Sequence, residues 1–575
     1  MSSAKKNKKK IGWEENPDYI AYQNTVVYAP GDIPLHPAGG KHCLTQKEIW
    51  ADFDPRTEPL HIQGDGSKYS FVAKQYGEGP LYVDVDVYRP EYPSKRAVLI
   101  VQEYGIPCQK EIITQLTSDG FTVFVPDYCG IKENTATDFP SCVEYGKYGM
   151  GMEHLTKVCP TAKETCNYLY TLILRRTITF IESEFSQKRP VLIGIRSGVE
   201  YAMQTAGCDK RVRALACLCG AGYSEFLSDS FYTAKELDLS PEKLAWLTGV
   251  AGVSYLIGAD LPLFVGVGSN DIRSDVDRLS SLCDLVGEKN VRAYICNGYS
   301  DNVTTSCFDT MKKWLRLTFL DASLPALPTV SIKINSDGTV YADVNADPVT
   351  PIRSTALFYA FDDMNHSTRN WNKAVGETVG KGEYLAHIPI PQENMKMLHY
   401  AHVCYENGVE LSGLVAMTDF TDKRLALTPQ TSDNVLYSFD TPGKTFTEFN
   451  EEPVLFSQAI VPATIPIGLQ GALDKGGKMI LFVGDVTKSI DKTGVLQVDC
   501  YSDKKEFDIT LCLSDSFGHD YYASKAVYTD TAFRDVLFNL TDFKDEMFHP
   551  LNDWGSAKRL TVCTENIVIG KLLFI

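Results

Sequence analysis

The segment PVLIGIRSG, residues 190–198, decides the fold of this chain. Its first six residues form an apolar run, which is typical of a strand buried on both faces. The residues after it, 199–206, fit a helix, so the chain must turn sharply between the two elements. Glycine at positions 194 and 198 would let strand and helix pack closely around this turn. The segment therefore predicts a strand–turn–helix unit with Arg196 at its tip.

Units of the same kind repeat on both sides of this segment. Apolar runs that fit buried strands occur at residues 97–101, 121–125, 212–218, 261–268 and 291–296, and residues 82–88 alternate like a half-exposed strand. Helical patterns cover residues 112–116, 162–185 and 307–320, with a helical insertion predicted at 224–258. Alternating strands and helices predict right-handed crossovers and a parallel sheet. We expect a doubly wound α/β domain at residues 60–322, preceded by an irregular leader at 1–59.

The C-terminal half is predicted to be β-rich. The sequence SLPALP, residues 323–328, is predicted to be an exposed linker that proteases cut early, as is the polar stretch from Thr428 to Asn434. The runs 330–334 and 339–344 alternate about Asp337-Gly338, which indicates a hairpin. We expect one all-β sandwich domain at residues 328–430 and a second at 433–575.

The net charge of −17 disfavours binding to nucleic acids or to anionic membranes, because both need a cationic surface. The one basic cluster, at Lys5, Lys6, Lys8, Lys9 and Lys10, is interpreted as a solvated tail. The chain has no apolar stretch long enough to span a membrane, and the lysines are not followed by the apolar core of a signal peptide. We therefore expect a cytoplasmic protein.

The sixteen cysteines are scattered and include no C-x-x-C pair. Many lie inside apolar runs, as Cys217 and Cys219 do. This pattern predicts buried, reduced thiols rather than a disulfide framework or a zinc site. We expect no metal and no cofactor.

The segment Gly194-Ile195-Arg196-Ser197-Gly198 stands where α/β-hydrolases carry the nucleophile elbow, G-x-S-x-G. The domain resembles the acetyl xylan esterase and dienelactone hydrolase branch of that superfamily over residues 45–320. The stretches that carry the resemblance, in addition to the elbow, are WADFDPR at 50–56, FTVFVPD at 121–127, DKRVRA at 209–214 and GSND at 268–271.

Transferred position by position, the resemblance implies a degenerate catalytic triad. Arg196 occupies the nucleophile position, and a guanidinium that is always protonated cannot act as a nucleophile. The histidine is expected within residues 297–301, yet the chain has no histidine from 155 to 365. The loop that is His-Gly-Gly in the family reads QEYG at 102–105, and the carboxylate of Glu103 would repel an oxyanion. Only Asp271 matches, at the position of the acid.

An active carbohydrate or acetyl esterase with a rearranged triad is the alternative. Ser197 could act as a nucleophile in a shifted register, although β-branched Ile195 and Val199 would then flank it. Its histidine would have to come from elsewhere, and His154, His42 and His61 are the candidates. Since the central position is not serine, the sequence favours a catalytically inactive relative.

Arg196 is expected to point into the former active site, where a buried guanidinium needs a carboxylate partner. Glu103 and Asp271 each follow a buried strand, and in a parallel sheet both would lie at the same edge as the elbow. We predict that Arg196 pairs with one or both of them and closes the site. The alternative is an open pocket that binds an acidic sugar or another small carboxylate at this helix N-terminus.

The β-rich half resembles domains that accompany carbohydrate-active enzymes. Residues 355–360 and 369–371 are similar to an immunoglobulin-like sandwich, and residues 433–575 resemble a galactose-binding-like jelly roll. The second resemblance implies a saccharide partner, with Tyr521, Tyr522 and Tyr528 as stacking residues. Trp371 and Trp554 are predicted to be core residues. A protein partner, or an assembly role in which the β domains act as interfaces, is the other interpretation.

Overall fold

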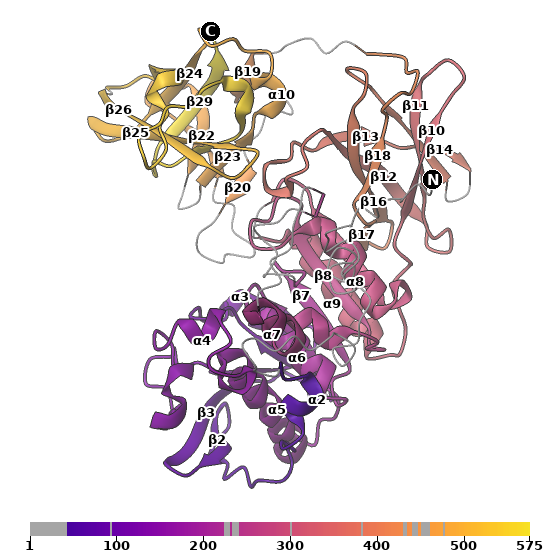
Figure 1. The fold of residues 1–575 in the computed structure, drawn as a ribbon, viewed down its shortest axis with the longest axis vertical. Helices are drawn as coiled ribbons and strands as arrows, with labels where there is room; N and C mark the ends of the chain where they lie inside the picture. The colour runs from indigo at the N-terminus through magenta and orange to yellow at the C-terminus, as the bar shows by residue number, and fades with distance from the viewer. Residues whose placement is uncertain are drawn as a thin grey trace, which may run out of the picture.

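The computed structural model describes residues 43–92, 95–222, 231–232, 241–299, 302–380, 383–428, 434–439, 447–449, 460–474, 478–528 and 530–575. The lysine tail, His42 and most of the stretch from Thr428 to Asn434 lie outside these residues. Figure 1 shows the chain as three bodies, an α/β body followed by two bodies made mainly of strands. We call the latter the first β region, residues 329–419, and the second β region, residues 435–574.

The α/β body is built on a nine-stranded sheet of order β1-β2-β3-β5-β4-β6-β7-β8-β9. The strands are β1 Gln63–Asp65, β2 Lys68–Tyr76, β3 Gly79–Tyr88, β4 Ala97–Val101, β5 Thr122–Pro126, β6 Val191–Ile195, β7 Ala214–Leu218, β8 Leu263–Gly268 and β9 Val291–Cys296. The pairs from β5 to β9 are parallel, as the sequence predicts, whereas β1, β2 and β3 form an antiparallel edge. The carboxyl ends of the parallel strands therefore share one edge.

Helices cover both faces of the sheet. The α-helices are α2 Gln46–Trp50, α3 Lys110–Ser118, α4 Glu153–Thr156, α5 Cys166–Phe185, α6 Gly198–Cys208, α7 Pro241–Gly249, α8 Leu279–Val286 and α9 Thr305–Thr318. Helices α5, α6 and α8 pack into one apolar cluster, and α3 and α9 into a second cluster across the sheet. Thr165 and Thr304 cap the N-termini of α5 and α9 through their side chains. The body is thus doubly wound.

Short 3₁₀ helices also occur along the described residues. They are η2 Ser141–Gly146, η3 Ala162–Glu164, η5 Gly252–Leu256, η6 Val276–Arg278, η7 Glu288–Asn290, η8 His366–Thr368, η9 Leu540–Asp542 and η10 Trp554–Ser556. The helical insertion expected at residues 224–258 corresponds in its described part to α7 and η5, and much of its first half lies outside the described residues.

The end of the expected leader is an ordered part of the α/β body. Trp50 of α2 stacks on Tyr168 of α5 with ring centroids 4.8 Å apart. The buried guanidinium of Arg176 donates to the carbonyls of Pro55 and Glu58. Residues 43–59 therefore pack on α5 instead of forming an irregular tail.

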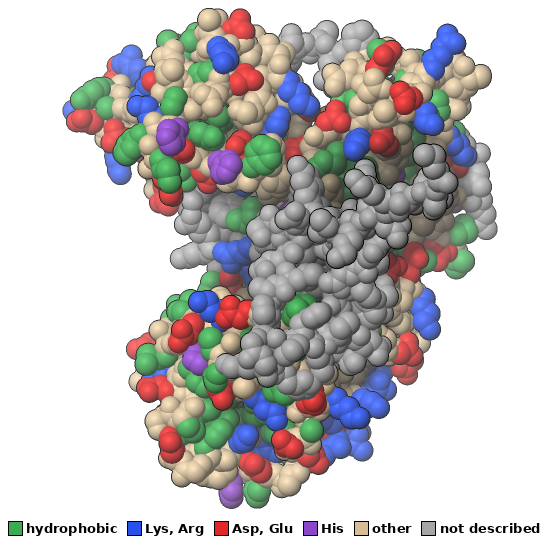
Figure 2. Space-filling model, viewed as in Figure 1, with side chains coloured by type: hydrophobic (Ala, Val, Ile, Leu, Met, Phe, Trp, Pro, Cys, Tyr) green, Lys and Arg blue, Asp and Glu red, His purple; other side chains and the backbone are tan. Residues whose placement is uncertain are grey.

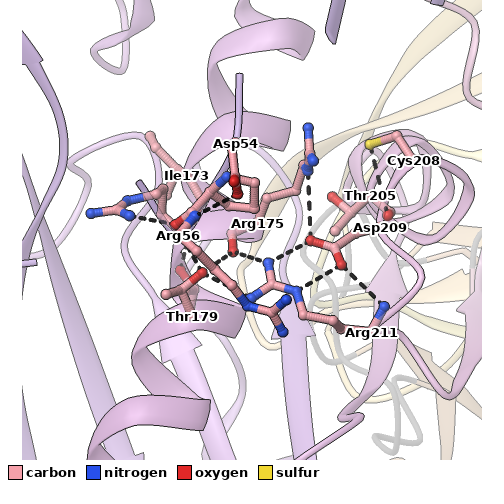
Figure 3. A network of polar contacts seen from close by, with 12 residues as sticks. Asp54, Arg56, Ile173, Arg175, Thr179, Thr205, Cys208, Asp209 and Arg211 are labelled. Atoms are coloured by element: carbon pink, nitrogen blue, oxygen red, sulfur yellow. Dashed lines mark hydrogen bonds and ion pairs between the residues drawn. The ribbon is translucent and has the colours of Figure 1, made fainter. Parts of the chain in front are cut away.

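A charged network holds this packing together (Figure 3). Asp209, which follows α6, accepts hydrogen bonds from Arg211 at 2.8 and 2.6 Å and lies 3.6 Å from Nε of Arg175. The Arg175 guanidinium covers the rings of Trp50 and Phe53, at 4.7 and 5.1 Å from their centroids. The leader is thus attached to α5 through Arg175, which has both an ionic partner and aromatic partners.

The first β region has two antiparallel sheets. Their orders are β10-β11-β15-β14 and β13-β12-β16-β17, with β18 also paired to β16. The strands are β10 Thr329–Ile334, β11 Val340–Asn345, β12 Ile352–Phe361, β13 Asn372–Val375, β14 Glu377–Gly380, β15 Glu383–Ile388, β16 Lys396–Tyr405, β17 Glu410–Ser412 and β18 Ala416–Asp419. The predicted hairpin is confirmed, because Ile334 pairs with Val340 across a turn in which Gly338 has a φ of +86°. Trp371 is half-buried against Tyr400.

The second β region is also antiparallel, with orders β21-β22-β29-β24-β27 and β20-β23-β28-β25-β26, and β19 paired to β29. The elements are β19 Val435–Ser438, β20 Thr447–Phe449, β21 Ile460–Thr464, β22 Gln470–Asp474, β23 Lys478–Phe482, α10 Gly484–Thr487, β24 Val495–Tyr501, β25 Glu506–Asp515, β26 Asp520–Tyr528, β27 Arg534–Asn539, β28 Ala557–Val562 and β29 Val568–Phe574. Trp554 is fully buried in this core, and its indole N–H donates to the carbonyl of Gly494 at 3.0 Å.

The segment 323–328 differs from the exposed linker that the sequence predicts. Leu324 and Leu327 are buried, and the carbonyl of Leu324 accepts two hydrogen bonds from the Arg292 guanidinium, at 3.1 and 2.9 Å. The prolines suggested a turn, but Leu324 and Leu327 attach the segment to the packed structure. This connection is therefore part of the packed structure.

All sixteen cysteines are thiols that form no disulfide, and ten of them are buried. This agrees with the absence of a disulfide framework from the sequence pattern. Among the described residues, none of the helices combines the length and the apolarity that crossing a membrane requires.

Candidate functional site

The turn between β6 and α6 has the strained geometry that its sequence predicts. Arg196 has a φ of +50°, in the left-handed region that side chains other than glycine rarely adopt. A Cβ on Gly194 would lie 2.7 Å from the Cα of Val199, and one on Gly198 would lie 2.2 Å from the carbonyl oxygen of Val101. Both glycines are therefore required for the helix to sit against β6 and β4.

The side chain of Arg196 lies in a buried charged cluster at the carboxyl edge of the sheet. Its guanidinium is 3.2 Å from the Glu103 carboxylate, and the two side chains are 0% and 10% exposed. It also donates to the Asn302 side-chain oxygen at 3.2 Å. A second guanidinium, that of Arg273, donates to the other Glu103 oxygen at 2.5 Å. The structure thus contains the predicted Arg196–Glu103 pair, with Arg273 added to it.

Asp271 lies on the loop that follows β8, at the same edge of the sheet. It is fully buried, and its Oδ1 accepts a hydrogen bond from the backbone N–H of Arg273 at 2.8 Å. This places Arg273 beside both acidic positions that the resemblance singles out. Arg273 therefore contacts Glu103 through its guanidinium and Asp271 through its backbone.

Ser197 begins α6 and is exposed. Its Oγ accepts a hydrogen bond of 2.9 Å from the backbone N–H of Tyr104. Tyr104 belongs to the loop after β4, where a hydrolase would hold its oxyanion. Among the described residues, we find no hydrogen bond between a histidine and Ser197. The serine oxygen thus satisfies the backbone N–H of the loop after β4.

The candidate histidines lie elsewhere. His154 stacks on Tyr145 at 4.3 Å, and its Nδ1 contacts the carbonyl of Glu164 at 2.6 Å. His61 is exposed and His42 is outside the described residues. The histidine that does approach the acid loop is His366, whose Nε2 lies 2.9 Å from the carbonyl oxygen of Asp271. Sequence reasoning missed it because it comes from the first β region.

His366 belongs to a joint between the first β region and the loop after β8. Arg369 donates two hydrogen bonds of 2.8 Å to the carboxylate of Asp277. The side chain of Asn270 donates to the carbonyls of His366 and Arg369, at 3.1 and 2.7 Å. The loop that would present the catalytic acid of a hydrolase is thus packed against a neighbouring region.

A small hollow of about 250 Å³ lies beside the elbow. It is lined by Glu103, Ile195, Cys108 and apolar residues of the loop before α3. Burial raises the pKa of the Cys108 thiol to about 12, so this cysteine stays protonated at neutral pH. This volume includes open solvent, and the enclosed space is only about 10 Å³, which is about the size of one water molecule.

The three candidate tyrosines lie on β26, an edge strand, but do not share a face. Tyr522 and Tyr528 are exposed, whereas Tyr521 is half-buried and packs against the core. The hydroxyl of Tyr528 donates to Glu506 at 2.8 Å. Because six residues of strand span about 20 Å, Tyr522 and Tyr528 stand too far apart to stack on one sugar ring.

Two turns with the same Asp-x-x-x-His pattern flank Tyr521, and the sequence reasoning missed them. In one, His519 bonds through Nδ1 to Asp515 at 2.9 Å, and in the other His549 bonds to Asp545 at 3.1 Å. The second turn lies beside the first because Lys544 forms a bridge with Tyr522. Large apolar side chains are exposed on both turns, namely Phe517 (82%), Met547 (78%) and Phe548 (79%). Figure 2 shows two histidine side chains among hydrophobic ones on the second β region, at the upper left.

No protein-family model matches the chain, and no curated protein matches it. Solved structures of esterases and hydrolases resemble its N-terminal half. An acetyl xylan esterase from Paenibacillus sp. R4 is 15% identical with a TM-score of 0.34, covering 46% of this chain and 90% of its own. The 2,6-dihydroxy-pseudo-oxynicotine hydrolase is 14% identical with a TM-score of 0.31, covering 46% and 70%. Est1E from Butyrivibrio proteoclasticus is 10% identical with a TM-score of 0.30, covering 46% and 98%.

These likenesses are too distant to carry an argument about activity. The description of the α/β body as a hydrolase-type fold depends on its own strand order, its crossovers and the strained turn at Arg196.

Proposed function

We propose that this chain is a non-catalytic protein built on an α/β-hydrolase fold, and that it binds a saccharide through its second β region. The buried Arg196–Glu103 pair at the elbow is the observation that supports a non-catalytic protein. An ion pair at the nucleophile position occupies the space that an acyl substrate would need. It also places a carboxylate in the loop where an ester's developing oxyanion requires hydrogen-bond donors.

The joint at the acid loop supports the same conclusion. In a working triad the acid orients a histidine. Here the loop bearing Asp271 is held by Arg369, Asn270 and His366 against the first β region. A loop fixed in this way serves the packing between regions, which fits a scaffold better than a catalytic centre.

The twin turns support the second half of the proposal. Sugar-binding surfaces combine exposed aromatic rings with a few polar groups that orient the hydroxyls. Phe517 and Phe548 supply exposed rings, and the Asp515–His519 and Asp545–His549 pairs supply donors and acceptors beside them. We therefore propose the two turns and Tyr522 as the saccharide site, in place of the three tyrosines of β26 alone.

Two assays test the two halves separately. A fluorophosphonate probe and p-nitrophenyl acetate hydrolysis report an activated serine, and we expect neither labelling nor turnover. Stoichiometric labelling of Ser197 would instead establish the rearranged esterase.

Affinity electrophoresis on xylan and a glycan array then test binding. We expect retardation that is lost in a Phe517→Ala, Phe548→Ala double variant and kept in Tyr528→Ala, a matched control at the far end of β26. If no glycan binds and the double variant changes only self-association, the β regions act as assembly interfaces instead.

A further inference from the structure

Three side chains of different chemistry converge on one face of the first β region. His402 and Cys404 are two residues apart on β16, so both point to the same side of the sheet. Glu410 of β17 lies directly opposite Cys404 in the strand register. One ligand atom from each, a ring nitrogen, the thiol sulfur and a carboxylate oxygen, lies within 4.8 Å of the other two. Among the described residues, this is the one such group of three.

The imidazole of His402 is held in a defined orientation. Its Nδ1 lies 3.0 Å from the hydroxyl of Ser412, which in turn accepts the backbone N–H of Ile295 at 2.8 Å. Its Nε2 faces the Glu410 carboxylate at 3.3 Å. Nδ1 thus contacts the hydroxyl of Ser412, and Nε2 points towards the carboxylate of Glu410.

The carboxylate of Glu410 is positioned in the same way. Tyr294 of β9 donates its hydroxyl to Oε2 at 2.8 Å, and Arg353 lies 3.3 Å from Oε1. The Arg353 side chain is 58% exposed and can turn towards solvent. The imidazole and the carboxylate thus each have an outer partner that fixes them, as is usual around protein-bound metals.

This geometry differs from that of a Cys–His–acid catalytic triad. A triad places the nucleophile and the acid on opposite nitrogens of the ring. In this cluster Ser412 occupies Nδ1 while the acid faces Nε2. Convergence of sulfur, nitrogen and oxygen on one point is instead the pattern of a metal site.

We propose that His402, Cys404 and Glu410 bind one zinc ion. Zinc accepts thiolate, imidazole and carboxylate ligands together and prefers four-coordinate geometry. The three side chains are half-buried, so water can supply the fourth ligand. The site adjoins the α/β body through Tyr294 and Ile295, and a bound ion would stabilise the docking of β17 against β9. This proposal departs from the metal-free protein expected from the cysteine pattern and does not depend on the proposed saccharide binding.

The test uses the full-length protein after removal of metals with a chelator. Titration with Co²⁺ alone is expected to give one equivalent of binding and a sulfur-to-cobalt charge-transfer band, which Zn²⁺ abolishes on addition. Cys404→Ser should lose the band, and Cys563→Ser, a matched cysteine of the second β region, should keep it. Ser412→Ala, which removes the partner of the imidazole, should weaken binding roughly 10–100-fold.

A wild-type protein without this band, or a Cys404→Ser variant that retains it, overturns the proposal. If Cys404→Ser does not fold by circular dichroism, Glu410→Gln replaces it. Crystals of the wild-type protein grown with Zn²⁺ provide a measurement that needs no variant. Anomalous density between the three side chains is the expected result, and its absence at full zinc loading contradicts the site.

Discussion

Arg369 and Asp277 form a bidentate ion pair in which both side chains are 0% exposed, with both hydrogen bonds at 2.8 Å. The two residues are 92 positions apart and belong to different regions of the chain. The same segment of the first β region also reaches the second one, since Asn365 donates to the carbonyl of Ser516 at 3.1 Å and Asn370 to Asp485 at 2.6 Å. This segment thus joins all three bodies.

Removing one member of this pair should be costly, because it leaves the other charge buried without its partner. We expect Arg369→Met to lower the free energy of unfolding by roughly 3–5 kcal/mol. The double variant Arg369→Met, Asp277→Asn should lose less than the sum of the single changes. Urea unfolding followed by fluorescence measures this. Lys333→Met, which breaks the half-exposed pair with Asp343, is the control and should cost about 0–1 kcal/mol.

Substitutions of Arg196 and of Glu103, the partners of the buried ion pair at the elbow, should destabilise the protein by different amounts. Arg196→Ala leaves Glu103 with a partner, since Arg273 remains bonded to it. Glu103→Gln removes the carboxylate that both guanidinium groups share, and Arg196 is the more deeply buried of the two. We therefore expect Glu103→Gln to destabilise the protein more than Arg196→Ala, within the roughly 3–5 kcal/mol of a broken buried pair. Equal losses in chemical denaturation would contradict the shared carboxylate.

Restoring a serine should not restore activity. Arg196→Ser recreates the G-x-S-x-G motif, but His154 stacks on Tyr145 and His366 contacts the carbonyl of Asp271. Loss of triad members typically costs about 10⁴-fold or more in turnover. We expect p-nitrophenyl acetate hydrolysis by this variant to match that of the wild-type protein. A rate increase of a hundredfold would reveal a base that the present geometry does not supply.

Much of the α/β body could be predicted from the sequence because buried parallel strands are continuous apolar runs. The Arg196–Glu103 pair followed from one geometric rule, that carboxyl ends of parallel strands share an edge. Strands β1 and β2 were missed since the latter, KYSFVAKQY, carries lysines and a glutamine that weaken its alternation. His366 and Arg369 were missed for a different reason, because their contacts depend on how distant regions pack and no local pattern encodes that.

The sequence contains one signal of the proposed zinc site, the pair His402-x-Cys404. A search for C-x-x-C pairs does not detect His402-x-Cys404, whose ligands share a face only if the segment is a strand. Glu410 completes the set across a hairpin, and its register with Cys404 is known only once the strands are paired.

The connection between the α/β body and the first β region should resist proteases. Sequence composition predicted early cleavage at residues 323–328, but Leu324 and Leu327 are buried and Arg292 holds the backbone. A protease must pull such a segment out of its packing before it can cut. We expect limited proteolysis to leave the 323–328 bonds intact in the first fragments, as read by mass spectrometry. Arg292→Ala should make the same bonds sensitive, whereas Arg316→Ala, which removes an exposed contact with Asp119, should not.

His399 of β16 should make the stability of the protein depend on pH. Burial lowers the pKa of this imidazole from 6.5 to about 4 in the folded chain, where its Nε2 lies 3.0 Å from the Thr418 hydroxyl. Below pH 6.5 the unfolded chain takes up a proton that the folded chain does not accept until about pH 4. The unfolded state therefore binds more protons over this window, and the free energy of unfolding must fall as pH falls.

The loss attributable to His399 should reach roughly 3 kcal/mol near pH 4 and vanish above pH 7. We expect urea unfolding at stepped pH to give a shallower acid slope for His399→Gln than for the wild-type protein. His387→Gln, on an exposed position of β15, should leave the wild-type slope unchanged. If His399→Gln and wild type lose stability in parallel between pH 6.5 and 4, the imidazole already takes up its proton in the folded state, and burial does not govern its titration.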